Sequence, residues 1–168
     1  MKLAEFEPLT KAEQEVIDGL GTGRTILLGD GTLPGENAGE NRRVDASLIR
    51  WLALGAPGDD KVHLHEKGLR IAGALVVSDG QVDQLTSSTT PGLDLEDCTL
   101  TNSLALLACR FQHPLILRSA RVPSLNLHRS IFPAFIAPAL EIKNECFLHH
   151  AQSEGPVILQ GASIGGDL

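Results

Sequence analysis

The chain has 168 residues, of which 42% are hydrophobic and 21% charged, and this suits one soluble domain, or a domain and a half, whose core needs no disulfide or metal. Its formal net charge is −7, and no basic patch points to direct nucleic-acid binding. No apolar run reaches the roughly 20 residues that cross a bilayer, and the acidic, interrupted N-terminus is unlike a signal peptide, so we expect a cytoplasmic protein.

The N-terminal segment, residues 1–60, is predicted to form a small helical cap with loops. Thr10 followed by Glu13 is a capping box that predicts a helix to about Leu20, ended by Gly21. The segment holds eleven Asp and Glu against six Lys and Arg. Most of the negative charge of the chain therefore lies in this cap, and the surface of the remaining residues is nearly neutral.

A second helix is predicted over residues 46–54, where Asp45 can cap its N-terminus. Residues 24–28 favour a short strand, and residues 34–43 read as a polar loop because they are rich in Gly, Asn and charged side chains. The segment therefore supplies two helices and one strand for the rest of the chain to pack against.

Residues 61–168 are dominated by a repeat, in which apolar and small residues recur in units of ten or eleven from Leu93 onward. The first position holds Leu93, Leu104, Leu115, Leu125, Phe135, Cys146 and Val157, and the third holds Leu95, Leu106, Leu117, Leu127, Ala137, Leu148 and Leu159. The sixth position, mostly small, holds Cys98, Cys109, Ala120, Ser130, Leu140, Ala151 and Ala162, and the eighth holds Leu100, Phe111, Val122, Phe132, Ile142, Ser153 and Ile164. The pattern begins earlier, with Leu69, Ile71, Ala74 and Val76 at the same four positions.

Each unit consists of two pentads whose inward residues lie two apart, a spacing that puts both side chains on one face of an extended segment. Four such sides close one coil of 20–22 residues, so the sequence predicts a stack of Leu93, Leu115, Phe135 and Val157 at spacings of 22, 20 and 22. Amphipathic helices need spacings of three and four, and the prolines in this region exclude long helices. We therefore predict a mainly β fold, a parallel β-helix, with the two helices covering its first coil.

Two places depart from the repeat. Residues 79–92 break the pentad count and are expected to form a loop thrown out of an early coil. At the C-terminal end, the segment ASIGGDL stops as another unit begins, and no terminal cap follows. We expect the solenoid over 61–168 to be truncated there, as the N-terminal portion of a larger protein; the alternative is that this end pairs with another copy.

Groups that could bind a metal are few. Cys98, Cys109 and Cys146 lack metal-ligand spacing and fall at small inward positions, which fits free thiols in a reducing compartment. His63 and His65 would share one face of a strand, but no third ligand follows at a suitable spacing. His149 and His150 would point to opposite faces of an extended segment, which argues against a joint site. We assign no metal and no cofactor.

Motifs for catalysis are weak. The glycine-rich GLGTGR at 19–24 follows a helix rather than a strand, so it lacks the geometry of a phosphate cradle. Asp94 and Glu96 would share an outer face near Asp97, as carboxylates do in β-helix lyases and hydrolases, but with no basic partner they read as a solvated face. A period of five rather than six excludes a hexapeptide acyltransferase. We assign no catalytic residue.

One surface feature suggests binding. Ile116, Ile131 and Ile136 occupy outward positions on two neighbouring sides of the predicted coil, with Pro133 and Pro138 next to two of them. Together they would form an apolar patch, which predicts contact with a protein partner or with a second copy.

The pentads resemble the pentapeptide-repeat family, whose consensus is A-(D/N)-L-x-x, over about Leu69 to Leu168. The chain departs from this consensus because Leu alternates with small residues at the inner site and few Asp or Asn follow. The segments GLRIAGALVVSDG and GLDLEDCTL resemble a divergent bacterial subgroup with a short helical head. The resemblance implies a right-handed quadrilateral β-helix, and the handedness rests on it alone.

Three functions are considered. The first is a non-catalytic protein-interaction or scaffold module, because stacked coils make a rigid rod with flat faces. The second is a DNA mimic that acts on a type II topoisomerase, as some family members do; the nearly neutral coil surface disfavours it. The third is part of a larger protein, since some relatives carry the label "membrane-associated oxidoreductase", although no residue of this chain supports that label.

Overall fold

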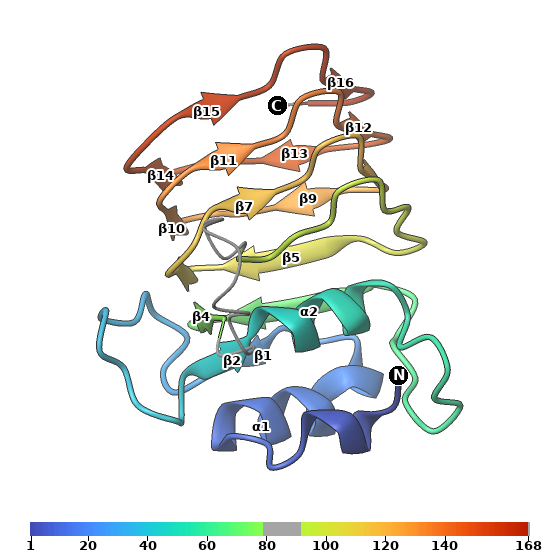
Figure 1. Ribbon diagram of the computed structural model, residues 1–168, viewed down its shortest axis with the longest axis vertical. Coiled ribbons are helices and arrows are strands. Elements are labelled where there is room, and N and C mark those ends of the chain that lie inside the picture. The colour runs from blue at the N-terminus through green and yellow to red at the C-terminus, as the bar shows by residue number, and fades with distance from the viewer. Residues whose placement is uncertain (79–91, 168) are drawn as a thin grey trace, which may run out of the picture.

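The computed structural model describes residues 1–78 and 92–167, and its strands form four parallel sheets that we name A to D (Figure 1). Sheet A contains β1 (Ile26–Leu27), β3 (Leu69–Ala72), β5 (Leu104–Leu107), β9 (Leu125–Asn126) and β13 (Cys146–Phe147). Sheet B contains β2 (Arg43–Asp45), β4 (Leu75–Val77), β6 (Arg110–Phe111), β10 (Ile131–Phe132) and β14 (Gln152–Ser153). Sheet C contains β7 (Leu115–Ile116), β11 (Phe135–Ile136) and β15 (Val157–Ile158), and sheet D contains β8 (Arg121–Val122), β12 (Glu141–Ile142) and β16 (Ser163–Ile164).

The chain visits the four sheets in turn, and we call one such passage a coil. From β5 onward each strand pairs with the strand four further along. Leu115 pairs with Phe135, and Phe135 with Val157, while a bridge from Asp94 to Ile116 sets Leu93 in the same column. The predicted stacking is thus confirmed, and the coils pile up as stacked parallel β-structure, an arrangement compatible with a solenoid.

The interior is filled by the inward residues of the repeat, nearly all of them aliphatic. Leu95, Leu106 and Leu117, at the third position, are fully buried. Ser130, at a small inward position, is also fully buried, and its hydroxyl donates to the Leu106 carbonyl at 2.6 Å and accepts from the Cys109 N–H at 3.0 Å. A small polar residue is tolerated there because it completes its hydrogen bonds to the neighbouring coil.

The corners of the coils share a feature that the sequence did not predict. The residue just before each small inward position has a positive φ, in most coils without being glycine: Asp97, Ala108, Ser119, Arg129, Ala139 and His150. In a representative corner the Ala120 N–H donates to the Leu117 carbonyl at 3.1 Å, which closes a four-residue turn whose third residue is left-handed. The side chains at this position have no common chemistry, and therefore the turn could not be predicted from residue type.

The head of the molecule contains the predicted helices. Its elements are η1 (Leu3–Phe6), α1 (Lys11–Gly19), η2 (Leu20–Thr22) and α2 (Ala46–Ala53). The capping box of α1 and the Asp45 cap of α2 are confirmed. The predicted stop at Gly21 is wrong, because a 3-10 turn continues through Thr22. This turn is ended by Gly23, which has a φ of 66°. No helix within the described ranges is long and apolar enough to span a bilayer.

The head also supplies strands, and it is therefore continuous with the sheets. Ile26 of β1 pairs with Ile71 of β3, and Val44 of β2 pairs with Val76 of β4, so sheets A and B begin before residue 60. The helices lie at the end of the stack nearest the N-terminus, where α2 follows directly from β2 (Figure 1). The division of the chain at residue 60 stays a prediction, and the predicted loop at 79–92 lies, except for Gly92, outside the described residues.

Candidate functional site

Sheet C carries an isoleucine on each of its three strands, at the same register. Ile116 pairs with Ile136, and Ile136 with Ile158, while the residue before each of them points inward in the alternation of a strand. Ile116 and Ile136 are half-buried, and Ile158 is 38% exposed. These three residues, which we call the isoleucine column, form an apolar row down the outside of the sheet.

The predicted apolar patch is divided between two sheets. Ile116 and Ile136 lie on sheet C and Ile131 on sheet B, as the sequence indicated for neighbouring sides. Ile131 is in register with Arg110 below it and Gln152 above it. It is therefore an isolated apolar residue between two polar ones. Pro133 and Pro138, both half-buried, follow β10 and β11. That these residues bind a partner stays a prediction.

Ile158, the third member of the column, was not among the residues predicted to form the apolar patch. Ile158 stands 22 residues after Ile136, the same interval that separates Phe135 from Val157, so the period was sufficient to find it. Its neighbour Val157 is 51% exposed although it occupies an inward position. The last described coil thus presents more apolar surface than the coils before it.

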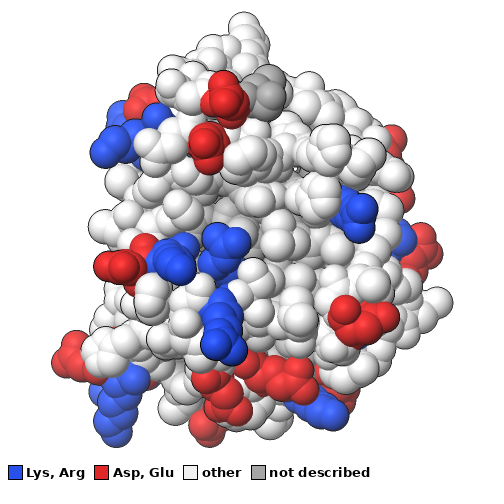
Figure 2. Space-filling view, turned by 180° about the vertical axis from the view of Figure 1, so that it is seen from behind, with Lys and Arg blue, Asp and Glu red and all other residues white. Residues whose placement is uncertain are grey.

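Charged side chains near the column are held by ion pairs and hydrogen bonds. Glu96, on the turn after Leu95, pairs with Arg118 at 3.1 Å, which corrects the expectation that these carboxylates have no basic partner. Asp94 accepts the Glu96 N–H within its own turn, and its carbonyl accepts from Arg50. On the opposite side of the molecule, Figure 2 shows charges of both signs scattered over the surface, with acidic side chains gathered along the edge near the N-terminal elements.

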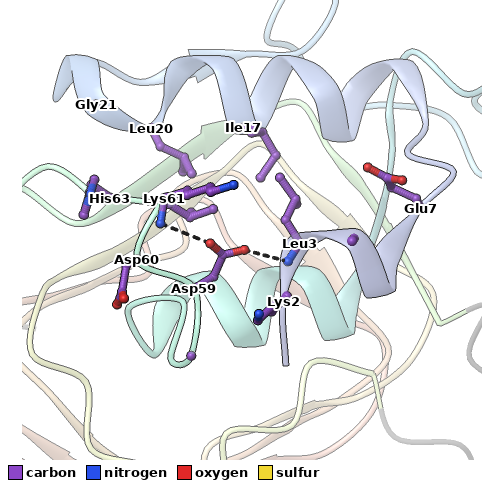
Figure 3. A pocket seen from close by; sticks show the side chains of 13 residues that line it. Lys2, Leu3, Glu7, Ile17, Leu20, Gly21, Asp59, Asp60, Lys61 and His63 are labelled. Atoms are coloured by element: carbon purple, nitrogen blue, oxygen red, sulfur yellow. Dashed lines mark hydrogen bonds between the residues drawn. The ribbon is translucent and has the colours of Figure 1, made fainter.

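A cavity of about 620 Å³ lies in the head, between η1, the end of α1 and the loop at 58–63 (Figure 3). Asp59 points into it and accepts the Leu3 N–H at 3.0 Å and the Lys61 N–H at 3.1 Å. These backbone hydrogen bonds, Leu3 first, lower the pKa of Asp59 below its ordinary value. The carboxylate therefore holds η1 against the loop, and these hydrogen bonds favour its ionised form.

A groove of about 680 Å³ runs over sheet D. Its polar residues are Arg121, Glu141, Lys143 and Ser163, and Arg121 donates to Glu141 at 2.9 Å. This exposed pair raises the pKa of Arg121, because the hydrogen bond and the carboxylate charge both favour the guanidinium. In this groove the Arg121 and Glu141 charges neutralise one another, and Lys143 adds a further positive charge.

The histidines predicted on a strand lie in a loop. His63 is exposed on the rim of the cavity in the head, and the ring of His65 accepts the Lys67 N–H at 3.2 Å. The segment forms no ladder, so the prediction of two histidines on one strand face is wrong. Across residues 1–78 and 92–167, no group of three or more His, Cys, Asp or Glu is arranged to hold a metal.

A second correction concerns His149 and His150, whose rings were expected to point apart. Their centroids lie 4.0 Å from one another, and His128 of the coil below stacks on His149 at 5.5 Å. The reason is local: His150 has a φ of 56°, so the segment turns at this point and does not stay extended.

The three cysteines are free, and the two most buried are unreactive. Burial raises the pKa of the Cys109 thiol to about 12 and that of Cys146 to about 11. Both thiols therefore stay protonated at neutral pH and act as small packing groups. Cys98 is partly exposed and accepts from Arg50 at a long 3.6 Å.

Comparison of the chain with models of known families, with curated proteins and with solved structures gave no match. The function must therefore be argued from the residues and their geometry.

Proposed function

We propose that this chain is a non-catalytic protein-interaction or scaffold module, built on a right-handed quadrilateral β-helix of the pentapeptide-repeat type. The observation that carries the proposal is the isoleucine column, in which Ile116, Ile136 and Ile158 follow one another at the strand spacing on the outside of sheet C. Strands lie about 4.8 Å apart, so the column is a continuous apolar row on a rigid support.

The proposed fold is supported by the way four sheets recur in order along the chain. Coil lengths of 20–22 residues, small residues at the inner sites and left-handed residues at the corners together favour a four-sided coil. Two points support a cytoplasmic location: the cysteines are free, and two of them are buried where oxidants reach them poorly.

The described surface gives little support to the DNA-mimic alternative. A mimic of duplex DNA needs rows of carboxylates along the rod. The outward residues of sheet C are isoleucines after Asp94, and those of sheet D are Thr99, Arg121, Glu141 and Ser163. A row of this composition is nearly neutral.

The proposal is tested by placing a charge in the column. We expect Ile136→Asp combined with Ile158→Asp to abolish association, measured first as solution mass by light scattering across a concentration series. The wild-type chain and the doubly substituted chain would then each be immobilised, and the two would be compared for stoichiometric capture of a protein from an extract of the source organism. Ser163→Asp, an outward position on sheet D, is the matched control.

Two results would reject the module. One is a partner, or a second copy, bound equally well by the wild type and by the doubly charged variant. The other is the absence of any association in either assay for the wild-type chain. Loss of binding in the Ser163→Asp control as well would point to a general loss of structure and would also count against a specific column.

A further inference from the structure

Three histidine rings meet at the corner between sheets A and B. His128 belongs to the turn after β9, and His149 and His150 to the equivalent turn after β13. The rings of His128 and His149 are stacked, with centroids 5.5 Å apart and planes within 4° of parallel. The ring of His150 meets both at an angle of 61°, 4.0 Å from His149 and 6.1 Å from His128.

Two features of the chain create this cluster. His128 and His149 stand 21 residues apart, which is the length of this coil, and the Arg129 N–H donates to the His149 carbonyl at 3.0 Å to keep the turns in step. His150 joins them because its left-handed backbone turns the segment. The cluster is therefore a product of the stacking of coils and does not exist within one coil.

A cation lies beside the His128 ring, and the charged or titratable groups that act on it among the described residues are Arg129, His149 and His150. Arg129 lies on the same turn as His128. The corner of the coil below carries Leu107 and Ala108, and the Ala108 N–H donates to the His128 carbonyl at 2.8 Å. The outward neighbours on β9 and β13 are Asn126 and Phe147, and the strands that follow the two turns begin with Ile131 and Gln152. Protonation of His128 thus adds a positive charge beside the Arg129 guanidinium.

The electrostatics of His128 agree with this geometry. Its loss of hydration on packing, followed by the charges of Arg129 and His149, lowers its pKa below the ordinary value of 6.5. The folded state therefore favours the neutral imidazole, the form in which stacked rings attract and do not repel one another.

We propose that this histidine cluster makes the last described coils sensitive to acid: protonation of His128, stacked on the His149 ring and next to Arg129, separates the rings and loosens the corner that holds β13 and the strands after it. The evidence for this inference does not rest on the proposed interaction function, because the cluster lies on the corner between sheets A and B and the isoleucine column lies on sheet C. The segment that loosens nevertheless includes Ile158 on β15.

The sign of the effect follows from the lowered pKa. A histidine whose pKa is lower in the folded state binds fewer protons than it does in the unfolded chain at the same pH. Stability is then unaffected well above pH 6.5, and it falls as the pH drops below that value. Each pKa unit of lowering reduces the folding equilibrium constant by about tenfold at low pH.

The test is amide hydrogen exchange of the full chain, corrected for the intrinsic pH dependence of exchange, at pH 7.5 and pH 5.5. We expect exchange within residues 146–167 to accelerate at the lower pH while residues 1–78 change little. His128→Gln should abolish the acceleration, because it removes the ring whose pKa is lowered. His149→Gln combined with His150→Asn should reduce it, since the stacked partner is lost and Asn accepts the left-handed backbone at position 150. Fixing a charge with His149→Lys should accelerate exchange in the same segment already at pH 7.5.

His63→Asn is the matched control, because it removes an exposed imidazole of the head far along the chain from the cluster. It should leave the acid acceleration unchanged. An equal acceleration in the wild type and in the His128→Gln variant would overturn the proposal, and so would a His149→Lys chain whose exchange at pH 7.5 equals that of the wild type.

Discussion

The head and the coils of this protein are held together in different ways. In the coils one contact pattern recurs: an inward aliphatic side chain stacks on its equivalent in the next coil, and the backbone pairs in parallel. In the head each contact occurs once. Buried Glu13, for example, accepts the N–H groups of Thr10 and Asp45 and so joins α1 to the start of α2. Repetition spreads the stability of the coils over many similar residues, whereas the head depends on a few particular ones.

A second contrast lies within the coils themselves. Phe135 and Val157 occupy the same column, yet Phe135 is 1% exposed and Val157 is 51% exposed. The position in the repeat decides which way a side chain points, and the presence of coils on both sides decides whether it is buried. The following predictions probe these contrasts, beginning with the largest effect.

We expect Phe135→Ala to lower the free energy of unfolding by about 3–5 kcal/mol, because it removes a fully buried ring from a packed column. Val157→Ala, one coil further on in the same column, should cost less than about 1 kcal/mol because half of that side chain is already in water. Urea denaturation measures both. Similar costs for the two substitutions would mean that the column is packed alike in both coils.

In the head, Glu13→Ala should cost about 2–3 kcal/mol, because two partly buried N–H groups lose their acceptor. Glu5 is the matched control: it caps η1 in the same manner, accepting the Lys2 N–H at 2.8 Å, but it is exposed. Replacing it by Ala should cost about 0.5 kcal/mol. If the two substitutions lower the free energy of unfolding equally in thermal or urea denaturation, the buried Glu13 contact does not stabilise the head more than the exposed one does.

The loop of the head should respond to acid through Asp30. Hydrogen bonds from the Thr32 hydroxyl and N–H, and then from Arg42, lower the pKa of Asp30 from 3.8 to about 2, and Arg42 also donates to the Gly73 carbonyl at 3.1 Å. A lowered carboxyl pKa contributes stability that is present above pH 3.8 and is lost as the pH falls through about 2.

Asp30→Asn should therefore reduce the loss of stability between pH 4 and pH 2. At the acid end of this range, the wild type and the variant should have similar free energies of unfolding. The measurement is the denaturant midpoint at each pH. A variant whose midpoint keeps the wild-type slope over this range would show that Asp30 is not held in the ionised form.

The smallest effect concerns the corners. Ala139 has a φ of 55°, and Gly161 has a φ of 71° at the equivalent corner of the next coil. A left-handed backbone costs a residue with a Cβ about 1–2 kcal/mol, and replacement by glycine removes this cost. Part of the gain is offset because glycine has more conformational freedom in the unfolded chain. Ala139→Gly should thus raise the free energy of unfolding by about 0.5 kcal/mol.

Gly161→Ala is the reverse experiment, and it should lower the stability by a similar amount. An added Cβ at Gly161 would meet no atom closer than 3.9 Å, so the conformation and not a clash determines the cost. Changes of the same sign for the two substitutions would contradict the left-handed geometry of these corners.

The inward positions and the register of the coils could be predicted from residue spacing. Alternate residues of an extended segment point to opposite faces, and a sustained period leaves one way to bring the inward residues together. For this reason Leu93, Leu115, Phe135 and Val157 could be stacked correctly from their spacing. The same spacing predicts that Ile158 follows Ile136 on the outside of the sheet. It also predicts that His149 lies above His128, since the two stand one coil length apart.

Other features were decided by the tertiary structure alone. The left-handed corners are occupied by residues as different as Asp97 and Ala139, because the turn is imposed by the strands on either side of it. The ring of His150 joins the other two for the same reason. The head contributes β1 and β2 to the sheets, although its strand signals are short, because the edges of β3 and β4 offer them hydrogen-bonding partners. Local patterns state which face of a segment is apolar, but only the folded coils determine what lies beside it.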